Sequence, residues 1–164
     1  GIESKQIRKA LEGYQGAGRR LDIKLRNDKY LVIDDYAHHP TEIKATLSAI
    51  LNLEAKRKIV IFQPHRYSRT QLLLDEFAGS FLHADYLIIT DIYAASEKPI
   101  AGVNARILLR KIKERTADKE VVYLPKEEIV QHIKKIILAG DLVITLGAGD
   151  ISKVSDALAE ELKV

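Results

Sequence analysis

Two short segments concentrate the side chains that could do chemistry. The first, Asp34–Glu42, reads DDYAHHPTE and places two aspartates, a phenol and two imidazoles within nine residues. The second, His65–Thr70, reads HRYSRT and places Arg66 and Arg69 three residues apart. Carboxylates and imidazoles together suit proton transfer or the orientation of an amine, and paired guanidiniums suit capture of a carboxylate or a phosphate.

The doubled histidine of the first segment leaves three interpretations open. His38 and His39 belong to a binding site, ligate a metal, or stand in a strand–helix turn that Thr41 or Asp35 caps. We favour a binding site, because a capped turn does not need two imidazoles beside two carboxylates. A metal held by protein ligands is disfavoured, because adjacent side chains point in different directions and the sequence dictates no third ligand.

The arginine pair, Arg66 and Arg69, is either an anion clamp or two solvated surface side chains. Their spacing at the opening of a helix puts both guanidiniums on one side, and a helix N-terminus itself favours an anion. The pair follows directly after a predicted strand. Ligands of open parallel sheets bind beyond the carboxyl ends of the strands, so this position favours the clamp.

A third segment, Gly147–Asp150, resembles a phosphate-binding turn only weakly. Ser152 stands where the last glycine of G-x-G-x-x-G would be, and the segment follows the last predicted strand rather than the first. It is either a backbone approach to part of a nucleotide or a simple tight turn. The sequence has no G-x-x-x-x-G-K-[ST] loop, so any ATP chemistry needs phosphate-binding residues from another domain.

The elements that position these segments are strand-length apolar runs that alternate with helix-length amphipathic runs. Strands are predicted over 21–26, 29–34, 58–63, 85–90, 120–124 and 141–146. Helices are predicted over 40–55, 70–83, 103–115, 126–138 and 152–162, the last capped by Ser152. Repeated strand–helix–strand units predict a doubly wound, Rossmann-like, three-layer α/β fold. Its six-stranded sheet is mostly parallel, with an antiparallel first strand joined to the second by a tight turn at Asn27-Asp28.

Composition excludes several classes of protein. The chain has 164 residues of which 46% are apolar, which is typical of one folded domain. Its 26 basic and 23 acidic residues are too balanced for a nucleic-acid partner. The absence of cysteine excludes disulfides and suits a reducing compartment. We expect no membrane partner, because no apolar run approaches the roughly 20 residues of a membrane helix, and no signal segment is visible.

Residues 1–17 differ in character from the rest. They contain a short helix candidate over 3–14 and a loose connection marked by Gly13, Gly16 and Gly18. The segment is either a stray N-terminal helix or the tail of a preceding central domain or linker. We expect the second, so that the domain proper spans 18–164.

Four motifs resemble, in order, the third, C-terminal domain of the Mur ligases. They are DDYAHHPTE (34–42), FQPHRYSRT (62–70), DIYAASEKPIAGV (91–103) and LGAGDI (146–151). Gly18–Leu21 resembles the junction between the family's central domain and this C-terminal domain. The resemblance covers about residues 18–162. Ala37 and Leu21 stand where the family often has Gly and Phe, and neither departure removes a functional group. Within the family, HHPTE with HRYSRT is most similar to members that add L-alanine.

The resemblance implies an ATP-dependent, amide-bond-forming ligase of cytoplasmic peptidoglycan synthesis. In the family, ATP phosphorylates the muramate carboxylate, the amine attacks the acyl phosphate, and ADP and phosphate leave. The central domain carries the P-loop and the Mg²⁺ ligands, and the N-terminal domain holds the UDP-sugar. The partners implied are therefore UDP-N-acetylmuramate, L-alanine, ATP and the two other domains, and the isolated chain is expected to be inactive.

The resemblance also assigns residues. The substrate-binding residues that it implies are Tyr36, His38, Arg66 and Arg69, and the nucleotide-binding residues are Arg19, Arg20, Asp34 and Asp35. His38 would orient the attacking amine or take its proton, as a catalytic group. The aspartates would face the ATP phosphates, Mg²⁺ or ribose, and no metal ligand is assigned to this domain. The alternatives are a sister ligase that adds a preformed peptide, a stand-alone nucleotide- or anion-binding module, and an interaction domain with solvated strand ends.

Overall fold

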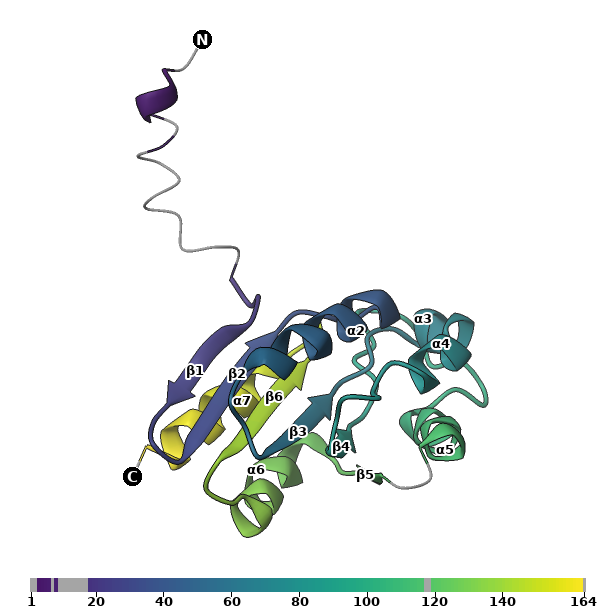
Figure 1. Ribbon diagram of the computed structural model, residues 1–164. Helices are drawn as coiled ribbons and strands as arrows, with labels where there is room; N and C mark the ends of the chain where they lie inside the picture. The colour runs from purple at the N-terminus through teal and green to yellow at the C-terminus, as the bar shows by residue number, and fades with distance from the viewer. Residues whose placement is uncertain (1–2, 7, 9–17, 117–118, 164) are drawn as a thin grey trace.

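The fold is a six-stranded sheet between two layers of helices (Figure 1). The computed structural model describes residues 3–6, 8, 18–116 and 119–163. The strands are β1 (Asp22–Arg26), β2 (Tyr30–Asp35), β3 (Arg57–Phe62), β4 (Tyr86–Ile89), β5 (Glu120–Tyr123) and β6 (Asp141–Leu146). They lie in the order β1-β2-β6-β3-β4-β5, and all neighbours are parallel except β1 and β2. The predicted fold class and all six predicted strands are confirmed.

The β1–β2 hairpin is closed by the predicted Asn27-Asp28 turn. The Asn27 side-chain oxygen accepts hydrogen bonds from the backbone N–H groups of Lys29 and Tyr30, at 3.0 and 2.7 Å. An asparagine that bonds its own backbone two or three residues on is a local turn signal. This is why the sequence alone could place the reversal.

Helices cover both faces of the sheet. They are α2 (Pro40–Ala49), the 3₁₀ helix η1 (Ile50–Asn52), α3 (Tyr67–Leu72), α4 (Leu74–Ala78), α5 (Ala105–Arg115), α6 (Lys126–Ile136) and α7 (Ser152–Glu161). Buried residues of α2, α4 and α5, such as Leu47, Phe77 and Leu108, pack on one face. Buried residues of α6 and α7, such as Ile133 and Leu158, pack on the other. The central strands β4 and β6 are buried along their whole length and are mostly apolar, because helices cover both of their faces.

The observed helices differ from the predicted ones in three main respects. The helix predicted over 70–83 is two short helices, broken at Leu73, where φ is −109° and ψ is 23°. Three consecutive leucines cannot share one stripe of a regular helix; the break lets Leu73 and Leu74 both pack on the core, while Leu72 is 80% exposed. The helix that starts at Pro40 ends at Ala49 and continues as η1. Ile151 is the N-cap of α7, so Ser152 is its first residue and not its cap.

The prediction for residues 1–17 falls mostly outside the described residues. Only 3–6 and 8 of that segment are described, so its origin in a preceding domain stays a prediction. None of the helices in the described part of the chain is long and apolar enough to cross a membrane.

Candidate functional site

The structure brings the two predicted segments together at the carboxyl edge of the sheet. Four rings follow one another there. Tyr36 lies edge-on to His38 with ring centroids 5.2 Å apart, His38 lies edge-on to His65 at 5.6 Å, and His65 stacks on Tyr93 at 5.6 Å. These residues follow β2, β3 and β4, so the parallel strands place them side by side. We call this set the ring row.

The tautomer of His38 follows from its neighbours. Its Nδ1 lies 3.0 Å from the carbonyl oxygen of Tyr36 and 3.3 Å from Oε2 of Glu42. Both are acceptors, so Nδ1 carries a proton and the neutral ring keeps its lone pair on Nε2. Burial raises the pKa of Glu42, but the backbone N–H and the charge of His38 outweigh it, and the pKa lies below its usual value. Glu42 is thus a fixed anion behind the imidazole.

His39, the second histidine of the pair, caps the N-terminus of α2. It is the N-cap of α2, and its Nδ1 accepts a hydrogen bond from the N–H of Thr41 at 3.4 Å. Glu42 Oε2 accepts in return from the N–H of His39 at 3.2 Å, which completes a capping box. The capped-turn alternative named Thr41 or Asp35 as the cap, whereas the structure has His39 in that position. The doubled histidine combines one residue in the ring row with one residue in a helix cap.

His65 has the opposite tautomer. Its Nδ1 lies 3.2 Å from Nη1 of Arg69. A guanidinium can only donate, so Nδ1 of His65 is the acceptor and the ring proton sits on Nε2. Burial lowers the pKa of His65, and the charges of Arg69, His38 and Arg66 lower it further. In these tautomers His65 offers its Nε2–H as a donor, whereas the neighbouring His38 offers its Nε2 as an acceptor.

Arg66 is exposed and holds an unusual backbone conformation. It is the N-cap of α3 with φ at 73°, a region that non-glycine residues rarely adopt. Its N–H donates to the carbonyl of Tyr93 at 2.8 Å, and its own carbonyl accepts from the N–H of Thr70 at 3.1 Å and from its hydroxyl at 2.8 Å. These bonds fix the backbone from which the guanidinium projects.

The N-terminus of α3 already holds an anion from the protein. The carboxylate of Glu97 accepts from the N–H of Ser68 at 3.0 Å and from its hydroxyl at 2.6 Å. The expectation that this helix start would itself attract a ligand anion is corrected by this contact.

Arg19 joins the ends of two strands. Its Nε donates to Oδ2 of Asp34 at 2.7 Å, and its Nη groups donate to the carbonyls of Gly147 and Gly149 at 2.6 and 3.1 Å. The guanidinium also lies over the ring of Tyr36, 5.3 Å from its centroid. With φ at 59°, Arg19 turns its side chain onto the domain. Its predicted contact with a nucleotide stays a prediction.

Asp34 and Asp35 point to opposite faces of β2, and both are buried. Asp34 is fully buried and accepts from Arg19 and from the hydroxyl of Thr145 at 2.6 Å. Asp35 accepts from the N–H groups of Leu21 and Ala37, each at 2.8 Å. Every carboxylate oxygen of the two residues has a donor within the domain, and their predicted contact with ATP phosphates, Mg²⁺ or ribose stays a prediction. Within the described residues, no group of three or more acidic or histidine side chains converges as a metal site.

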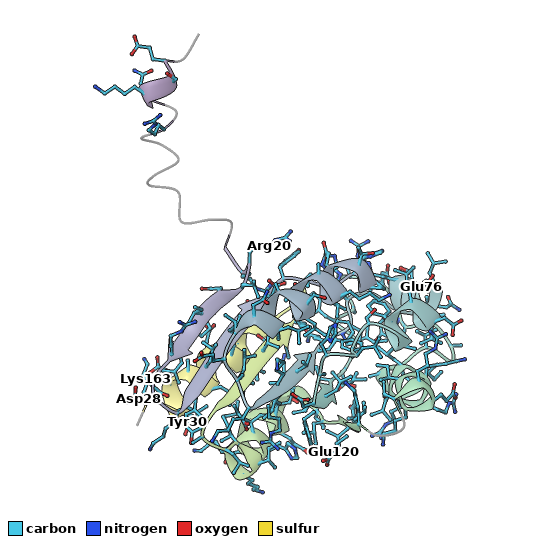
Figure 2. All side chains as sticks on the ribbon, in the orientation of Figure 1. Arg20, Asp28, Tyr30, Glu76, Glu120 and Lys163 are labelled. Atoms are coloured by element: carbon cyan, nitrogen blue, oxygen red, sulfur yellow. The ribbon has the colours of Figure 1, made fainter. Side chains whose placement is uncertain are left out.

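The side chain of Arg20 points into solvent, whereas that of Arg19 is hydrogen-bonded to the domain. It is exposed, and Figure 2 shows it projecting at one end of the β1–β2 hairpin, with Asp28 and Tyr30 at the other. Its charge contributes to the low pKa of Glu42, so it lies on the same edge as the ring row. Of the two adjacent arginines, only Arg20 presents its guanidinium outward.

The two glycines of the Gly147–Asp150 turn are required by close contacts with other residues of the domain. A Cβ on Gly149 would lie 2.4 Å from Oε1 of Gln63 and 2.6 Å from Cγ of Tyr93. Gly147 has φ at 151°, and a Cβ there would lie 2.9 Å from the carbonyl oxygen of Gln63. The close approach that requires glycine comes from Gln63 and Tyr93, which favours the tight-turn interpretation of this segment.

Five residues of the site were not predicted from the sequence. They are Glu42, Gln63, His65, Tyr93 and Glu97. All five stand inside the motifs that resemble the family, and an imidazole directly before an arginine pair was a usable signal. Tyr93 and Glu97 come from the segment after β4, and their sequence distance from the arginines hides the contact.

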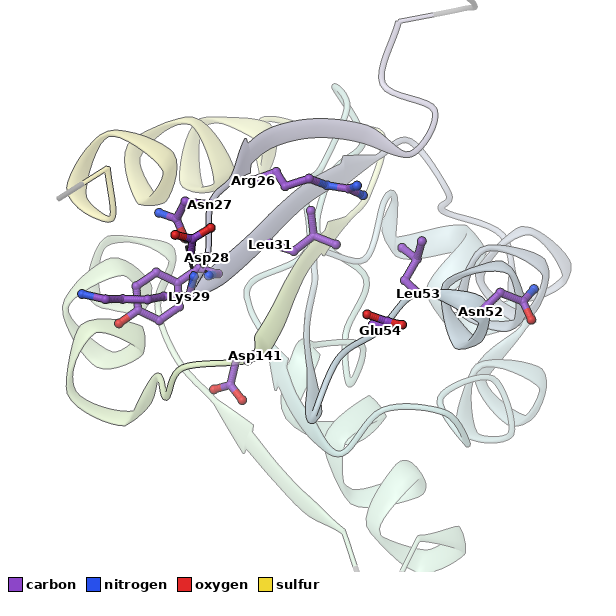
Figure 3. A pocket seen from close by; sticks show the side chains of 11 residues that line it. Arg26, Asn27, Asp28, Lys29, Leu31, Asn52, Leu53, Glu54 and Asp141 are labelled. Carbon is purple, nitrogen blue, oxygen red and sulfur yellow. Dashed lines mark hydrogen bonds between the residues drawn. The ribbon is translucent and has the colours of Figure 1, made fainter.

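A groove of about 390 Å³ lies at the opposite edge of the sheet (Figure 3). Arg26 and Leu31 line one side of it, and Leu53 and Glu54 line the other. It lies at the amino ends of the parallel strands, away from the ring row. Ligands of doubly wound sheets bind at the carboxyl ends, so this groove is not the candidate site.

Comparison with known proteins identifies the class. Residues 19–149 match the family described as Mur ligase, glutamate ligase domain, and the chain belongs to that family. It is 46% identical over 163 residues to the UDP-N-acetylmuramate–L-alanine ligase of Syntrophotalea carbinolica, covering 99% of this chain and 35% of the relative. It is 48% identical over 158 residues to the enzyme of the same name from Syntrophus aciditrophicus, covering 96% and 33%. The chain thus spans about a third of the length of the curated relatives that it matches.

Solved structures agree with this assignment. The UDP-N-acetylmuramate-alanine ligase of Thermotoga maritima superposes with a TM-score of 0.73 at 29% identity, over 93% of this chain and 32% of that one. A murein peptide ligase from Psychrobacter arcticus superposes with a TM-score of 0.70 at 25% identity, over 100% of this chain and 34% of that one. Both carry this fold as one part of a longer chain.

Proposed function

We propose that this chain is the amino-acid-binding, closing domain of a ligase that joins L-alanine to UDP-N-acetylmuramate with ATP. The observation that carries the proposal is the ring row beside the arginine pair, with two histidines in opposite tautomers. The names of the relatives that match nearly the whole chain support the same substrates. The triphosphate and Mg²⁺ would be bound by the domain that precedes this one, in the cytoplasm.

The arginine pair would bind the carboxylate of L-alanine. Arg66 and Arg69 flank the first turn of α3, and both charges act on His65. A guanidinium pairs with a carboxylate through two parallel hydrogen bonds, which would fix the position of the amino acid. With its carboxylate fixed, the amine would point along the ring row.

His38 would prepare the amine. L-Alanine arrives as an ammonium ion and must lose a proton before its nitrogen can attack. The lone pair on Nε2 of His38 is the acceptor available for that proton, and Glu42 on the far side of the ring stabilises the imidazolium that results. The nitrogen then bonds to the carbonyl carbon of the acyl phosphate. The bond from that carbon to the phosphate oxygen breaks, its electron pair leaves with the phosphate, and the departing phosphate takes the second proton from the nitrogen.

His65 would act as a neutral donor. Arg69 holds its Nδ1, so its Nε2–H is free to hydrogen-bond to an oxygen of the amino acid or of the muramoyl group. Because Arg69 donates to Nδ1 of His65, the lone pair of that ring is already engaged and the amine proton is left to His38. The two histidines would therefore divide the work between proton acceptance and oxygen binding.

Arg20 would be the nucleotide contact at the junction with the preceding domain. Three neighbouring residues would hold the backbone near Arg20 in place, because their polar atoms are hydrogen-bonded within the domain. They are Arg19, Asp34 and Asp35. Closure of this domain over the acyl phosphate would exclude water, which competes with the amine for the same carbon.

Substrate dependence of the full-length protein that carries this chain tests the proposal. ADP release is measured with ATP and UDP-N-acetylmuramate, and with L-alanine or a murein tripeptide as the acceptor. The proposal predicts ADP release that requires L-alanine, and none above background from the 164-residue chain alone. Turnover with the tripeptide but not with L-alanine would replace it by a peptide-adding ligase, and turnover by the chain alone would show that it is not one part of a larger site.

A further inference from the structure

The segment that follows β4 is bonded directly to the segment that carries the arginine pair. The N–H of Tyr93 donates to the carbonyl of Pro64, and the N–H of Arg66 donates to the carbonyl of Tyr93, each at 2.8 Å. His65 and Tyr93 form an isolated parallel bridge. The backbone around Arg66 is therefore set by a segment nearly thirty residues away, since Ser68 and Glu97 are 29 positions apart.

Further along the same segment, Glu97 accepts two hydrogen bonds from Ser68. One carboxylate oxygen accepts from the Ser68 N–H and the other from its hydroxyl. Two consecutive non-glycine residues, Ala95 and Ser96, hold positive φ values of 49° and 69° just before it. Such conformations cost free energy and persist only where surrounding contacts enforce them. The unfavourable backbone conformation at Ala95 and Ser96 places the Glu97 carboxylate beside the first turn of α3.

Ser68 lies between the two arginines in sequence. It is the second residue of α3, with Arg66 at the N-cap and Arg69 one position beyond Ser68. A carboxylate that fixes the Ser68 backbone fixes the start of the helix from which both guanidiniums project. The charge of Arg66 also acts on Glu97 and contributes to its low pKa, after the hydrogen bonds from Ser68. Glu97 thus lies near the guanidinium without lying in the ring row.

We infer that Glu97 is a positioning residue for the amino-acid carboxylate, acting through Ser68 on the directions of Arg66 and Arg69. It occupies the helix-start N–H and hydroxyl that would otherwise bind the ligand, so the ligand carboxylate is left to the guanidiniums. The inference rests on the proposed function, because it names a residue that serves the same site. It predicts an effect on amino-acid affinity that differs from an effect on folding.

Glu97→Gln in the full-length protein tests this, with Glu114→Gln as the matched control. Glu114 is an exposed acid on α5 whose nearest cation, Lys111, is 3.8 Å away. We expect Glu97→Gln to raise the apparent KM for L-alanine at least about fivefold, the scale of losing a charge-assisted hydrogen bond. The KM for ATP should stay within about twofold, as for a site without shared contacts. Glu114→Gln should change neither.

Ser68→Ala gives a second, independent readout. It removes the hydroxyl bond and keeps the N–H bond, so the KM for L-alanine should rise less than in Glu97→Gln. The double variant should be no worse than Glu97→Gln alone, because both changes break one contact. If Glu97→Gln failed to fold, a selective rise of the L-alanine KM in Ser68→Ala would still support the inference, and an unchanged KM would overturn it.

The outcomes separate this inference from the proposed function. A lowered melting temperature in Glu97→Gln with an unchanged KM for L-alanine would reduce Glu97 to a structural role and overturn the inference. An equal rise in the KM values for L-alanine and ATP would overturn it as well. If the unmodified protein released no ADP in response to L-alanine, the proposed function itself would fail, and the inference would fall with it.

Discussion

Replacing Arg19 with alanine should destabilise the domain strongly, although the side chain is on its surface. The guanidinium donates to Asp34 and to the carbonyls of Gly147 and Gly149, and so it joins the ends of β2 and β6. Its side chain is 24% exposed, whereas that of Asp34 is fully buried. The substitution removes the cation and leaves the carboxylate inside.

The magnitude follows from that asymmetry. Removing one partner of a fully buried ion pair costs about 3–5 kcal/mol. The partial exposure of Arg19 and the remaining bond from Thr145 to Asp34 reduce this figure, and we expect about 2–3 kcal/mol. For a domain of this size, that corresponds to a melting temperature lower by about 4–12 °C.

The assay is thermal unfolding of the 164-residue chain followed by circular dichroism. Arg20→Ala is the matched control, since this neighbouring arginine is exposed, and it should shift the midpoint by no more than about 2 °C. Arg19→Ala combined with Asp34→Asn should be less destabilised than the sum of the two single variants, because the neutral amide removes the stranded charge. An Arg19→Ala midpoint equal to that of Arg20→Ala, or strict additivity in the double variant, would show that Arg19 does not stabilise the buried Asp34 carboxylate.

Three further predictions concern the same edge of the sheet. Arg66→Gly should melt about 2–4 °C above Arg66→Ala, because only glycine relieves the positive φ, at a gain of about 1 kcal/mol; an alanine variant of equal or greater stability would contradict the strain. The unfolded chain binds the His65 proton more readily than the folded chain, whose His65 pKa lies below its usual 6.5. Stability should therefore fall as the pH drops below about 6.5, and His65→Gln should flatten the dependence of melting temperature on pH over that range; an unchanged slope would count against it. Gly149→Ala should cost about 1–3 kcal/mol by forcing a Cβ against Gln63 and Tyr93. Gly18→Ala, where a Cβ meets nothing within 4 Å, is its control, and equal midpoints for the two would refute the packing argument.

The sheet could be predicted almost completely from the sequence. β2, β3 and β6 are apolar runs bounded by polar or turn residues, and local pattern suffices to find them. The hairpin turn carries its own signal in Asn27. The two helices α3 and α4 were harder, because the break at Leu73 depends on which leucines the core can accept.

The site could be predicted only where its functional residues lie close together in the sequence. The motifs around His38 and Arg66 named the correct edge of the sheet. The division of roles within adjacent pairs could not be predicted. His39 became a cap because Glu42 returns to its N–H, and Arg19 turned onto the domain because its φ is 59°. Such outcomes depend on backbone dihedrals and distant partners that no window of sequence contains.

The most direct test of the amino-acid clamp is the L-alanine dependence of arginine variants in the full-length protein. Arg66→Ala and Arg69→Ala are compared with Arg110→Ala, which removes an exposed arginine of α5. We expect Arg66→Ala and Arg69→Ala each to raise the apparent KM for L-alanine by at least about tenfold, the factor for about 1.4 kcal/mol. Their KM for ATP should not change, and Arg110→Ala should leave both KM values unchanged. An unchanged KM for L-alanine in both Arg66→Ala and Arg69→Ala would show that these arginines do not bind the amino-acid carboxylate.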